Sequence, residues 1–204
     1  MMKKRFLISG GGTGGHIFPA LAIAKEIERR YPHCVLLFVG ASDRMEMDKI
    51  PALGYSIKGL WISGFQRSFS LKNFLFPIKL IFSVLRSFFI ILRFNPEVVI
   101  GTGGYASGPI LWVASLLKIP TIIQEQNSYP GITNKILSSK VSQICVAYPG
   151  LERFFPEEKL NLTGNPIRAE IELEVNNRDE VLSSFGFVKD KPTVLVLGGR
   201  LGSR

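Results

Sequence analysis

Short apolar runs alternate with longer amphipathic stretches along most of the 204-residue chain. The short runs are rich in β-branched residues and apolar on both faces, which is typical of strands buried in a parallel sheet. They predict strands over 5–9, 34–39, 55–59, 97–100, 120–123, 143–147 and 193–197. The longer stretches predict helices over 18–30, 43–52, 71–94, 107–117, 131–138, 150–154 and 177–185. This alternation predicts an α/β protein with a doubly wound, Rossmann-like parallel sheet.

A change in composition near residue 165 predicts a domain boundary. The segment "LTGNPIRAEIELEV" contains an Asn-Pro step, which disfavours helix, and a new helix-then-strand unit follows it. That unit ends in "TVLVLGGRLGSR", a strand with no further strand after it to pair with. We therefore expect a Rossmann-like domain over 1–165. Over 166–204 we expect a linker and the incomplete beginning of a second α/β domain.

The formal net charge of +9 comes largely from one part of the chain. No acidic residue lies between Asp48 and Glu97, whereas seven basic residues do. Four of these bases recur every seven residues among Phe and Leu side chains, so on a helix they would form one slowly drifting stripe. They are Lys72, Lys79, Arg86 and Arg93. A local excess of this kind predicts a specific anionic partner.

Two kinds of helix would fit this basic stretch. No uncharged run approaches the roughly 20 residues that a membrane span requires. A helix lying on an anionic membrane surface explains the missing acids best, and a core helix with one solvated edge is the alternative. Nucleic acid is disfavoured because the bases lie among long aliphatic side chains rather than polar and aromatic contact residues. We therefore expect an anionic membrane surface as a partner, and no nucleic acid.

Glycine-rich turns follow three of the predicted strands. Two of them, "GTGGHIFPALAIA" (12–24) and "GTGGYASGPILWVA" (101–114), share a Gly-Thr-Gly-Gly turn, a ring, a proline and then a helix. The third turn reads "LGGRLGS". Three such turns at the carboxyl ends of parallel strands predict a ligand cleft.

The first turn formally matches the dinucleotide fingerprint G-x-G-x-x-G through Gly10, Gly12 and Gly15. A dinucleotide-binding protein also needs an acidic residue at the end of the second strand, where Gly40 stands in this chain. No lysine follows the glycines, so a P-loop is excluded. A dinucleotide-dependent oxidoreductase and a tight turn without a ligand are therefore the lesser alternatives.

Polar side chains beside these turns are candidates for chemistry. His16 follows the first turn, where a neutral imidazole could accept a proton from a substrate hydroxyl; a histidine that only caps the turn is the alternative. After another predicted strand, "QEQN" (124–127) and Asn134 offer the donors and acceptors that sugars need, although a solvated loop with an Asx turn would look the same. No D-x-D motif occurs, and no His, Cys and carboxylate cluster has metal-ligand spacing, so we expect neither a metal nor another cofactor.

Four segments in order, "GGGTGGHIFPALAIA", "GTGGYASGP", "QEQNSYPGITNK" and "LTGNPIR", resemble the MurG family of bacterial glycosyltransferases. The resemblance runs over essentially all 204 residues. It implies a GT-B arrangement, in which two Rossmann-like domains face each other across a cleft. The activity it implies is metal-independent, inverting transfer of N-acetylglucosamine from UDP-N-acetylglucosamine to the muramyl 4-hydroxyl of lipid I. The product is lipid II for peptidoglycan.

The resemblance also implies roles for individual residues. His16 would be the base or the group that orients the acceptor. The residues on the UDP-N-acetylglucosamine side would be Thr13, Gly14, Gly15, Asn127 and Arg168. Those on the acceptor side would be Gly103, Gly104, Tyr105, Glu125 and Asn134. The membrane would be contacted by Lys72, Lys79, Arg86 and Arg93.

Two departures from the family pattern affect these expectations. Gln124 stands where the family often has histidine, and both side chains form hydrogen bonds. The last glycine turn reads "GGRLGSR" where the family usually has Gly-Gly-Ser-x-Gly-Ala, so Arg200 and Ser203 change the donor contacts expected of that loop.

Family members continue for well over a hundred further residues, so we expect this chain alone to be inactive. A non-catalytic membrane- or lipid-binding module is the rival hypothesis. The resemblance further implies a peripheral protein on the cytoplasmic face of the bacterial inner membrane. Its expected partners include proteins of cell-wall synthesis and cell division.

Overall fold

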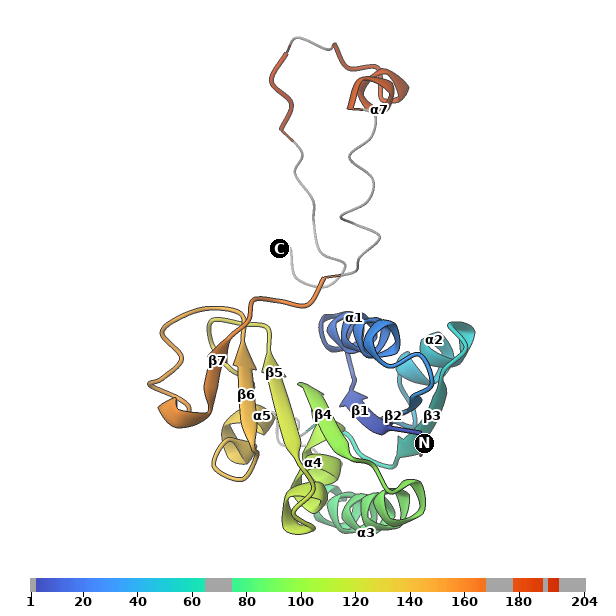
Figure 1. The fold of residues 1–204 in the computed structure, drawn as a ribbon, viewed down its shortest axis with the longest axis vertical. Helices are drawn as coiled ribbons and strands as arrows, with labels where there is room; N and C mark the ends of the chain where they lie inside the picture. The colour runs from blue at the N-terminus through green and yellow to red at the C-terminus, as the bar shows by residue number, and fades with distance from the viewer. Residues whose placement is uncertain (1–2, 65–74, 168–177, 189–190, 195–204) are drawn as a thin grey trace. The chain divides into compact units, whose positions relative to one another are not determined.

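The computed structural model describes residues 3–64, 75–167, 178–188 and 191–194. The chain divides into two compact units, Met1–Arg168 and Ala169–Arg204. The first unit contains a sheet with helices packed on it (Figure 1). In the second unit the structure describes helix α7 (Arg178–Ser184), in which Leu182 is buried. The assignment of 166–204 to a second α/β domain stays a prediction.

Seven strands form one sheet in the order β3-β2-β1-β4-β5-β6-β7, and every neighbouring pair is parallel. The α/β class with a Rossmann-like parallel sheet is therefore confirmed. The strands are β1 Arg5–Gly10, β2 Val35–Ala41, β3 Ser56–Leu60, β4 Val98–Gly103, β5 Thr121–Glu125, β6 Gln143–Val146 and β7 Leu160–Leu162. The strand order reverses between β1 and β4.

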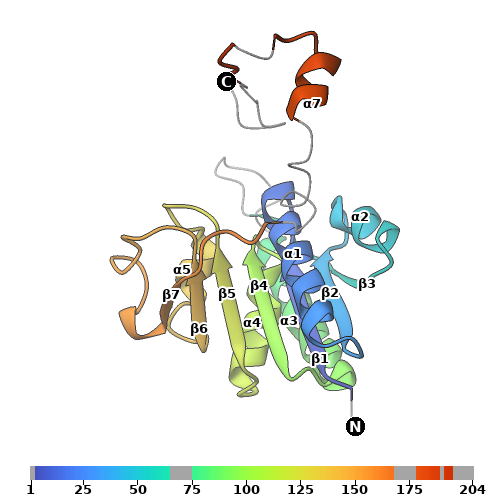
Figure 2. The same cartoon turned by 45° about the horizontal axis from the view of Figure 1, so that its top comes forward.

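Helices cover both faces of this sheet (Figure 2). On one face lie α1 (Gly14–Arg30) and α2 (Glu46–Ala52), and on the other lie α3 (Phe76–Phe94), α4 (Ser107–Leu116) and α5 (Ile132–Leu137). Because successive strand residues point to opposite faces, Leu7 and Ile8 of β1 enter different cores, and both are fully buried. The unbroken apolar runs in the sequence thus follow from burial on both faces of the sheet.

Three local predictions differ from the structure. Residues 150–154 form a turn and not a helix; the N–H of Phe154 donates to the carbonyl of Leu151, and Pro156 follows without an N–H to continue the pattern. Strand β7 was not predicted, because three residues at a sheet edge are too few for an alternating pattern. Of the predicted strand over 193–197, the two described residues are not in a strand, and the others lie outside the described residues.

Candidate functional site

The predicted catalytic and substrate-binding residues that the structure describes lie after the carboxyl ends of β1, β4 and β5. The loop after β1 leads into α1 on one face of the sheet, and the loop after β4 leads into α4 on the other face. Because neighbouring loops diverge where the strand order reverses, such a point is the usual place for a ligand crevice in a parallel sheet. The first two glycine turns of the sequence therefore lie side by side at the point where a ligand crevice is expected.

His16 lies in the first turn of α1 and reaches across to β4. Its Nδ1 lies 2.9 Å from the carbonyl oxygen of Thr102 and 3.2 Å from Oε1 of Gln126. Both partners are acceptors, so Nδ1 carries the proton and Nε2 is left as the acceptor of the ring. The side chain bonds to β4 and to the loop after β5, not to its own helix turn. A half-buried imidazole in this tautomer can accept a proton from a hydroxyl placed against Nε2.

The two glycine turns touch each other beside this histidine. A Cβ atom on Gly104 would collide with the carbonyl oxygen of Gly11, and one on Gly103 would lie 2.8 Å from Nδ1 of His16. The hydroxyl of Thr102 donates to the carbonyl oxygen of His16 at 2.8 Å, which ties β4 to α1 a second time. The second turn therefore needs glycine because another segment of backbone and a catalytic candidate lie directly against it.

Thr13, Gly14 and Gly15 form the beginning of α1, four residues earlier than the predicted start at 18. Thr13 is the N-cap residue, and its carbonyl accepts hydrogen bonds from the N–H groups of His16 and Ile17 at 3.2 and 3.3 Å. No acidic residue lies in the first turn, so the positive end of the helix dipole meets no carboxylate of its own helix there. These three residues border the crevice; their contact with UDP-N-acetylglucosamine stays a prediction.

Glu125 organises the polar loop that follows β5. Its buried carboxylate accepts hydrogen bonds from the backbone and side-chain amides of Asn127, both at 3.0 Å. It also accepts from the N–H of Gly131 at 3.0 Å and from Nδ2 of Asn134 at 2.8 Å. Four donors on one carboxylate hold this loop in shape. Glu125 therefore fixes the positions of Asn127 and Asn134, and its own contact with an acceptor stays a prediction.

One buried polar atom beside the glycine turns has no hydrogen-bond partner within the described part of the chain, Oδ1 of Asn134. The Asn134 side chain is close to Gly103. Leaving such an atom unpaired costs about 1–3 kcal/mol, so it has unused capacity to bind a ligand group. The Tyr105 ring lies against Gly12, and its hydroxyl meets no strict hydrogen-bond geometry but interacts with Arg44. Burial raises the pKa of this hydroxyl, and Arg44 partly offsets the rise. Both residues were predicted on the acceptor side.

Gln126 was one of the polar candidates after β5 but was given no role of its own, and here it links β4 to the end of β5. Its Nε2 donates to the carbonyl of Thr102 at 2.8 Å and to Oε1 of Gln124, while its Oε1 faces His16. Gln124 donates in turn to Oδ1 of Asn165 at 3.3 Å. The density of amides after β5 was the available signal. It did not show which of them would reach the histidine.

Four residues named from the sequence lie outside the described residues: Lys72, Arg168, Arg200 and Ser203. Their predicted contacts stay predictions. Within the described residues, no group of three or more His, Cys, Asp or Glu side chains is placed to hold a metal ion.

Helix α3 carries its large apolar side chains on the outside. Its buried residues are Ser83, Ser87 and Ile91. Its exposed apolar residues are Ile78, Leu80, Ile81, Phe82, Leu85, Phe88, Phe89 and Leu92. A core helix would have the opposite arrangement, so the interpretation of this segment as a core helix with one solvated edge is wrong. Within the described ranges, no helix has both the length and the hydropathy needed to cross a bilayer.

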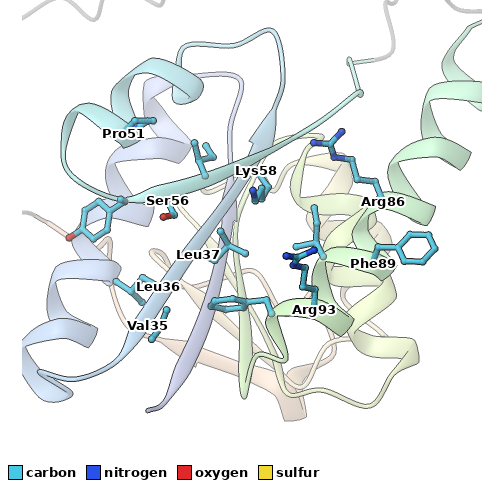
Figure 3. A pocket seen from close by; sticks show the side chains of 13 residues that line it. Val35, Leu36, Leu37, Pro51, Ser56, Lys58, Arg86, Phe89 and Arg93 are labelled. Carbon is cyan, nitrogen blue, oxygen red and sulfur yellow. The ribbon is translucent and has the colours of Figure 1, made fainter. Parts of the chain in front are cut away.

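The bases predicted to form one stripe have two different surroundings on this helix. Lys79 donates to the hydroxyl of Ser63 at 3.2 Å and lies 5.5 Å from the centre of the Trp61 ring. Arg86 and Arg93 instead border a groove of about 680 Å³ between α3 and the strands β2 and β3 (Figure 3). Much of its lining is apolar and includes Leu36, Leu37, Ile57, Ile90 and Phe94.

Lys58 of β3 is the third cation of this groove. None of the three cations forms a hydrogen bond or ion pair with another described residue, and the lining contains no acidic residue. Figure 3 shows the Arg86 and Arg93 side chains extending from α3 toward the strands, where Lys58 lies. The groove thus joins an apolar surface to unpaired positive charge, which suits an anionic amphiphile.

Comparison with known proteins gives consistent matches. The model of the glycosyltransferase family 28 N-terminal domain matches residues 6–146. A protein of Flavobacterium psychrophilum is 56% identical over 204 residues, which are 100% of this chain and 56% of that protein. One of Christiangramia forsetii is 60% identical over 201 residues, 98% of this chain and 55% of that protein. Both are named UDP-N-acetylglucosamine–N-acetylmuramyl-(pentapeptide) pyrophosphoryl-undecaprenol N-acetylglucosamine transferase.

Among solved structures, MurG of Acinetobacter baumannii matches with a TM-score of 0.66 and 28% identity. The match covers 83% of this chain and 47% of that one. The predicted resemblance to the MurG family is therefore confirmed by sequence and by structure. The chain spans just over half the length of the relatives that it matches, at 56% and 55%.

Proposed function

The chain belongs to glycosyltransferase family 28, and from this premise we propose that it forms the acceptor-binding half of a peptidoglycan glycosyltransferase. The reaction is transfer of N-acetylglucosamine from UDP-N-acetylglucosamine to the muramyl 4-hydroxyl of lipid I, which gives lipid II. The names of relatives 56% and 60% identical to the chain support this substrate pair. The observation that carries the proposal is the 2.9 Å contact between Nδ1 of His16 and the carbonyl oxygen of Thr102. A carbonyl only accepts, so the proton belongs on Nδ1 and Nε2 can act as a base.

In the proposed mechanism the 4-hydroxyl oxygen attacks the anomeric carbon on the face opposite UDP, so the configuration inverts. The bond from that carbon to UDP breaks, and UDP leaves with the electron pair. The hydroxyl proton passes to Nε2 of His16 as the new bond forms. A positioned base of this kind contributes roughly 10²–10⁴-fold to the rate. The reaction is metal-independent in this proposal, with backbone amides and positive helix ends balancing the diphosphate charge.

The two substrates occupy different sides of the crevice. Asn134 holds the acceptor through its unpartnered Oδ1 and Tyr105 lies on the same side, with Gly103, Gly104 and Glu125 shaping it. The donor side is formed by the start of α1, together with Asn127 and Arg168. Amide and hydroxyl groups suit this role because a sugar presents several hydroxyls that both donate and accept.

This chain alone does not turn over in our proposal, because it supplies one wall of the cleft. Holding the anomeric carbon against the acceptor hydroxyl accounts for roughly 7–11 kcal/mol of the barrier in well-oriented reactions. The relatives are nearly twice as long. In this proposal an additional part of that kind would supply the opposite wall. No further cofactor is required.

In this proposal the protein is peripheral on the cytoplasmic face of the bacterial inner membrane, and helix α3 is the part that docks. The exposed apolar face of α3 supports this, because it would enter the lipid surface. Lys79, Arg86 and Arg93 of α3, and Lys72 before it in the sequence, would meet anionic headgroups. The unpaired cations of the groove support this docking, because they have no acidic partner among the described residues. Proteins of cell-wall synthesis and cell division are further partners in this proposal, and nucleic acid is not one.

A non-catalytic lipid-binding module is the second candidate, and the outward apolar face of α3 favours it. The two functions are separated by a chimera that joins residues 1–167 of this chain to the C-terminal remainder of the Flavobacterium psychrophilum relative. The assay measures radiolabel transferred from UDP-N-acetylglucosamine to a lipid I analogue. We expect transfer by the chimera and none by the 204-residue chain alone.

In the chimera, His16→Ala should lower kcat by roughly 10² or more and abolish the fall in rate on the acidic side of the pH profile. His33→Ala is the matched control, since His33 is an exposed loop residue. Normal turnover by the His16 variant would return this residue to a structural role. An inactive chimera that still binds vesicles would favour the lipid-binding module.

A further inference from the structure

Glu46 is a fully buried acidic residue at the beginning of α2, directly beside the first glycine turn. Both of its carboxylate oxygens lie 3.2 Å from the N–H nitrogen of Gly12, and Oε1 also accepts from the N–H of Ala41 at 3.0 Å. It forms no ion pair with any described residue. Its charge is therefore held by backbone amides of two different strand ends, those of β1 and β2.

The chain leaves room for this carboxylate at two glycines. A Cβ atom on Gly11 would collide with Oε1 of Glu46, and one on Gly40 would lie 2.5 Å from its Cγ. Gly40 stands where a dinucleotide-binding protein has an acidic residue that faces a ribose. Here the carboxyl group of Glu46 from α2 packs against the ends of β1 and β2 and faces protein amides instead. The two glycines are thus explained by a buried side chain, without a nucleotide at this position.

The turn itself is shaped by this contact. In phosphate-binding turns the N–H groups of the glycines point at the ligand, whereas the Gly12 N–H points at Glu46. The turn then runs directly into α1, where His16 makes its bond to Thr102. A contact that holds the backbone of Gly12 in place therefore also holds the first turn of α1, which carries His16.

We propose that Glu46 is a positioning residue of the glycosyl-transfer site, whose carboxylate sets the glycine turn that aims His16 at the crevice between β1 and β4. Because it occupies the space beside the ends of β1 and β2, it also leaves the β1/β4 side as the place where substrate reaches the histidine. The anchoring of the turn stands on the contacts alone. Its effect on turnover rests on the proposed function, so the two parts have separate tests.

The anchoring is tested by NMR on the 204-residue chain. In wild type, the Gly12 amide should exchange with solvent at least tenfold more slowly than the amide of the exposed Gly15. Glu46→Gln keeps the size of the side chain but replaces one acceptor oxygen by an NH₂ group, which is itself a donor and cannot accept from the Gly12 N–H. The Gly12 amide hydrogen should therefore exchange with solvent at least tenfold faster than in wild type. The ¹⁵N shifts of the His16 ring should change, whereas those of the other histidine, His33, should not.

Asp48→Asn is the matched control, because Asp48 is an exposed acid on the same helix. It should leave Gly12 exchange and the His16 ring unchanged. Unchanged exchange and ring shifts in the Glu46 variant would overturn the proposal. If that variant does not fold, wild type still decides: Gly12 exchanging as fast as Gly15 would overturn it.

The effect on turnover is tested in the chimera of residues 1–167 described above. Glu46→Gln should lower kcat at least tenfold and leave KM for UDP-N-acetylglucosamine within twofold, and Glu46→Asp should recover part of the loss. A purely structural role would lower the amount of folded enzyme and leave kcat per folded molecule unchanged, which would overturn the catalytic part. An inactive wild-type chimera would count against the proposed function, while the NMR result would still decide the anchoring.

Discussion

The contact between the two glycine turns predicts a difference between two otherwise similar substitutions, Gly104→Ala and Gly150→Ala. Both glycines have a positive φ, +81° and +83°. A Cβ on Gly104 would collide with the carbonyl oxygen of Gly11, whereas one on Gly150 has nothing within 4 Å. The pair therefore shares its backbone strain and differs in the close approach alone.

The expected loss in the free energy of unfolding follows from the backbone strain and from the close contact. The left-handed conformation costs an L-residue about 1–2 kcal/mol, and the smaller conformational entropy of the unfolded alanine chain returns about 0.4–1 kcal/mol. Gly150→Ala should therefore lower the free energy of unfolding by roughly 1 kcal/mol or less. Gly104→Ala adds an overpacking cost of about 1–3 kcal/mol, because the atom it meets is backbone that cannot rotate away. We expect a total loss of about 1–4 kcal/mol for that variant.

The measurement is urea unfolding of the 204-residue chain, followed by far-UV circular dichroism. The two variants should have the m-value of wild type and different midpoints, with that of Gly104→Ala clearly lower. Equal midpoints for the two variants would refute the reasoning, because they would mean that the turns do not touch. A changed m-value for Gly104→Ala alone would mean that the variant alters more than this contact.

Two further predictions concern α3 and the sheet edge. Replacing Arg86 and Arg93 by glutamine should reduce binding to phosphatidylglycerol vesicles by tenfold or more at low salt, since each base near the surface contributes on the order of 1 kcal/mol. The same change at Lys118 and Lys140, which are exposed outside the groove, should have little effect, and equal losses for the two pairs would contradict the docking role. Burial and the hydrogen bond to the Glu28 carboxylate raise the pKa of the Tyr55 hydroxyl in the folded protein. The protonated hydroxyl therefore contributes fully to the free energy of unfolding below pH 10, the usual pKa of tyrosine, and this contribution is lost as the pH rises further. Tyr55→Phe should therefore flatten the loss of stability in urea midpoints measured above pH 10, and a slope like that of wild type would refute this assignment.

Much of the fold could be predicted from local pattern. Strands β1, β2 and β4 consist largely of apolar residues and glycine, because both faces of the sheet are buried there. The glycine turns and His16 were found for a related reason, since a turn between a strand and a helix leaves its residues adjacent in the sequence. The three-residue strand β7 was missed because its position depends on pairing with β6 and not on its own composition.

The orientation of α3 shows the limit of pattern. The sequence showed an apolar helix with a basic stripe, and two orientations of that helix were open. Packing chose the one with Ser83 and Ser87 inside and Phe82 and Phe89 outside. Periodicity measures which residues share a face, but the neighbouring elements decide which face is buried.

The sequence by itself determined the parallel α/β sheet, the two glycine turns and the family, because each is written in residues that are close together along the chain. The tertiary structure decided what these parts do to one another. The bond of His16 to Thr102 joins residues 86 positions apart, and that of Gly12 to Glu46 joins residues 34 apart. Such pairs leave no periodic signal, since each partner would read alone as an ordinary loop or helix residue. The hydrogen bond that places the proton on Nδ1 of His16 and the contact of Glu46 with the glycine turn therefore form only when the strands are paired in register.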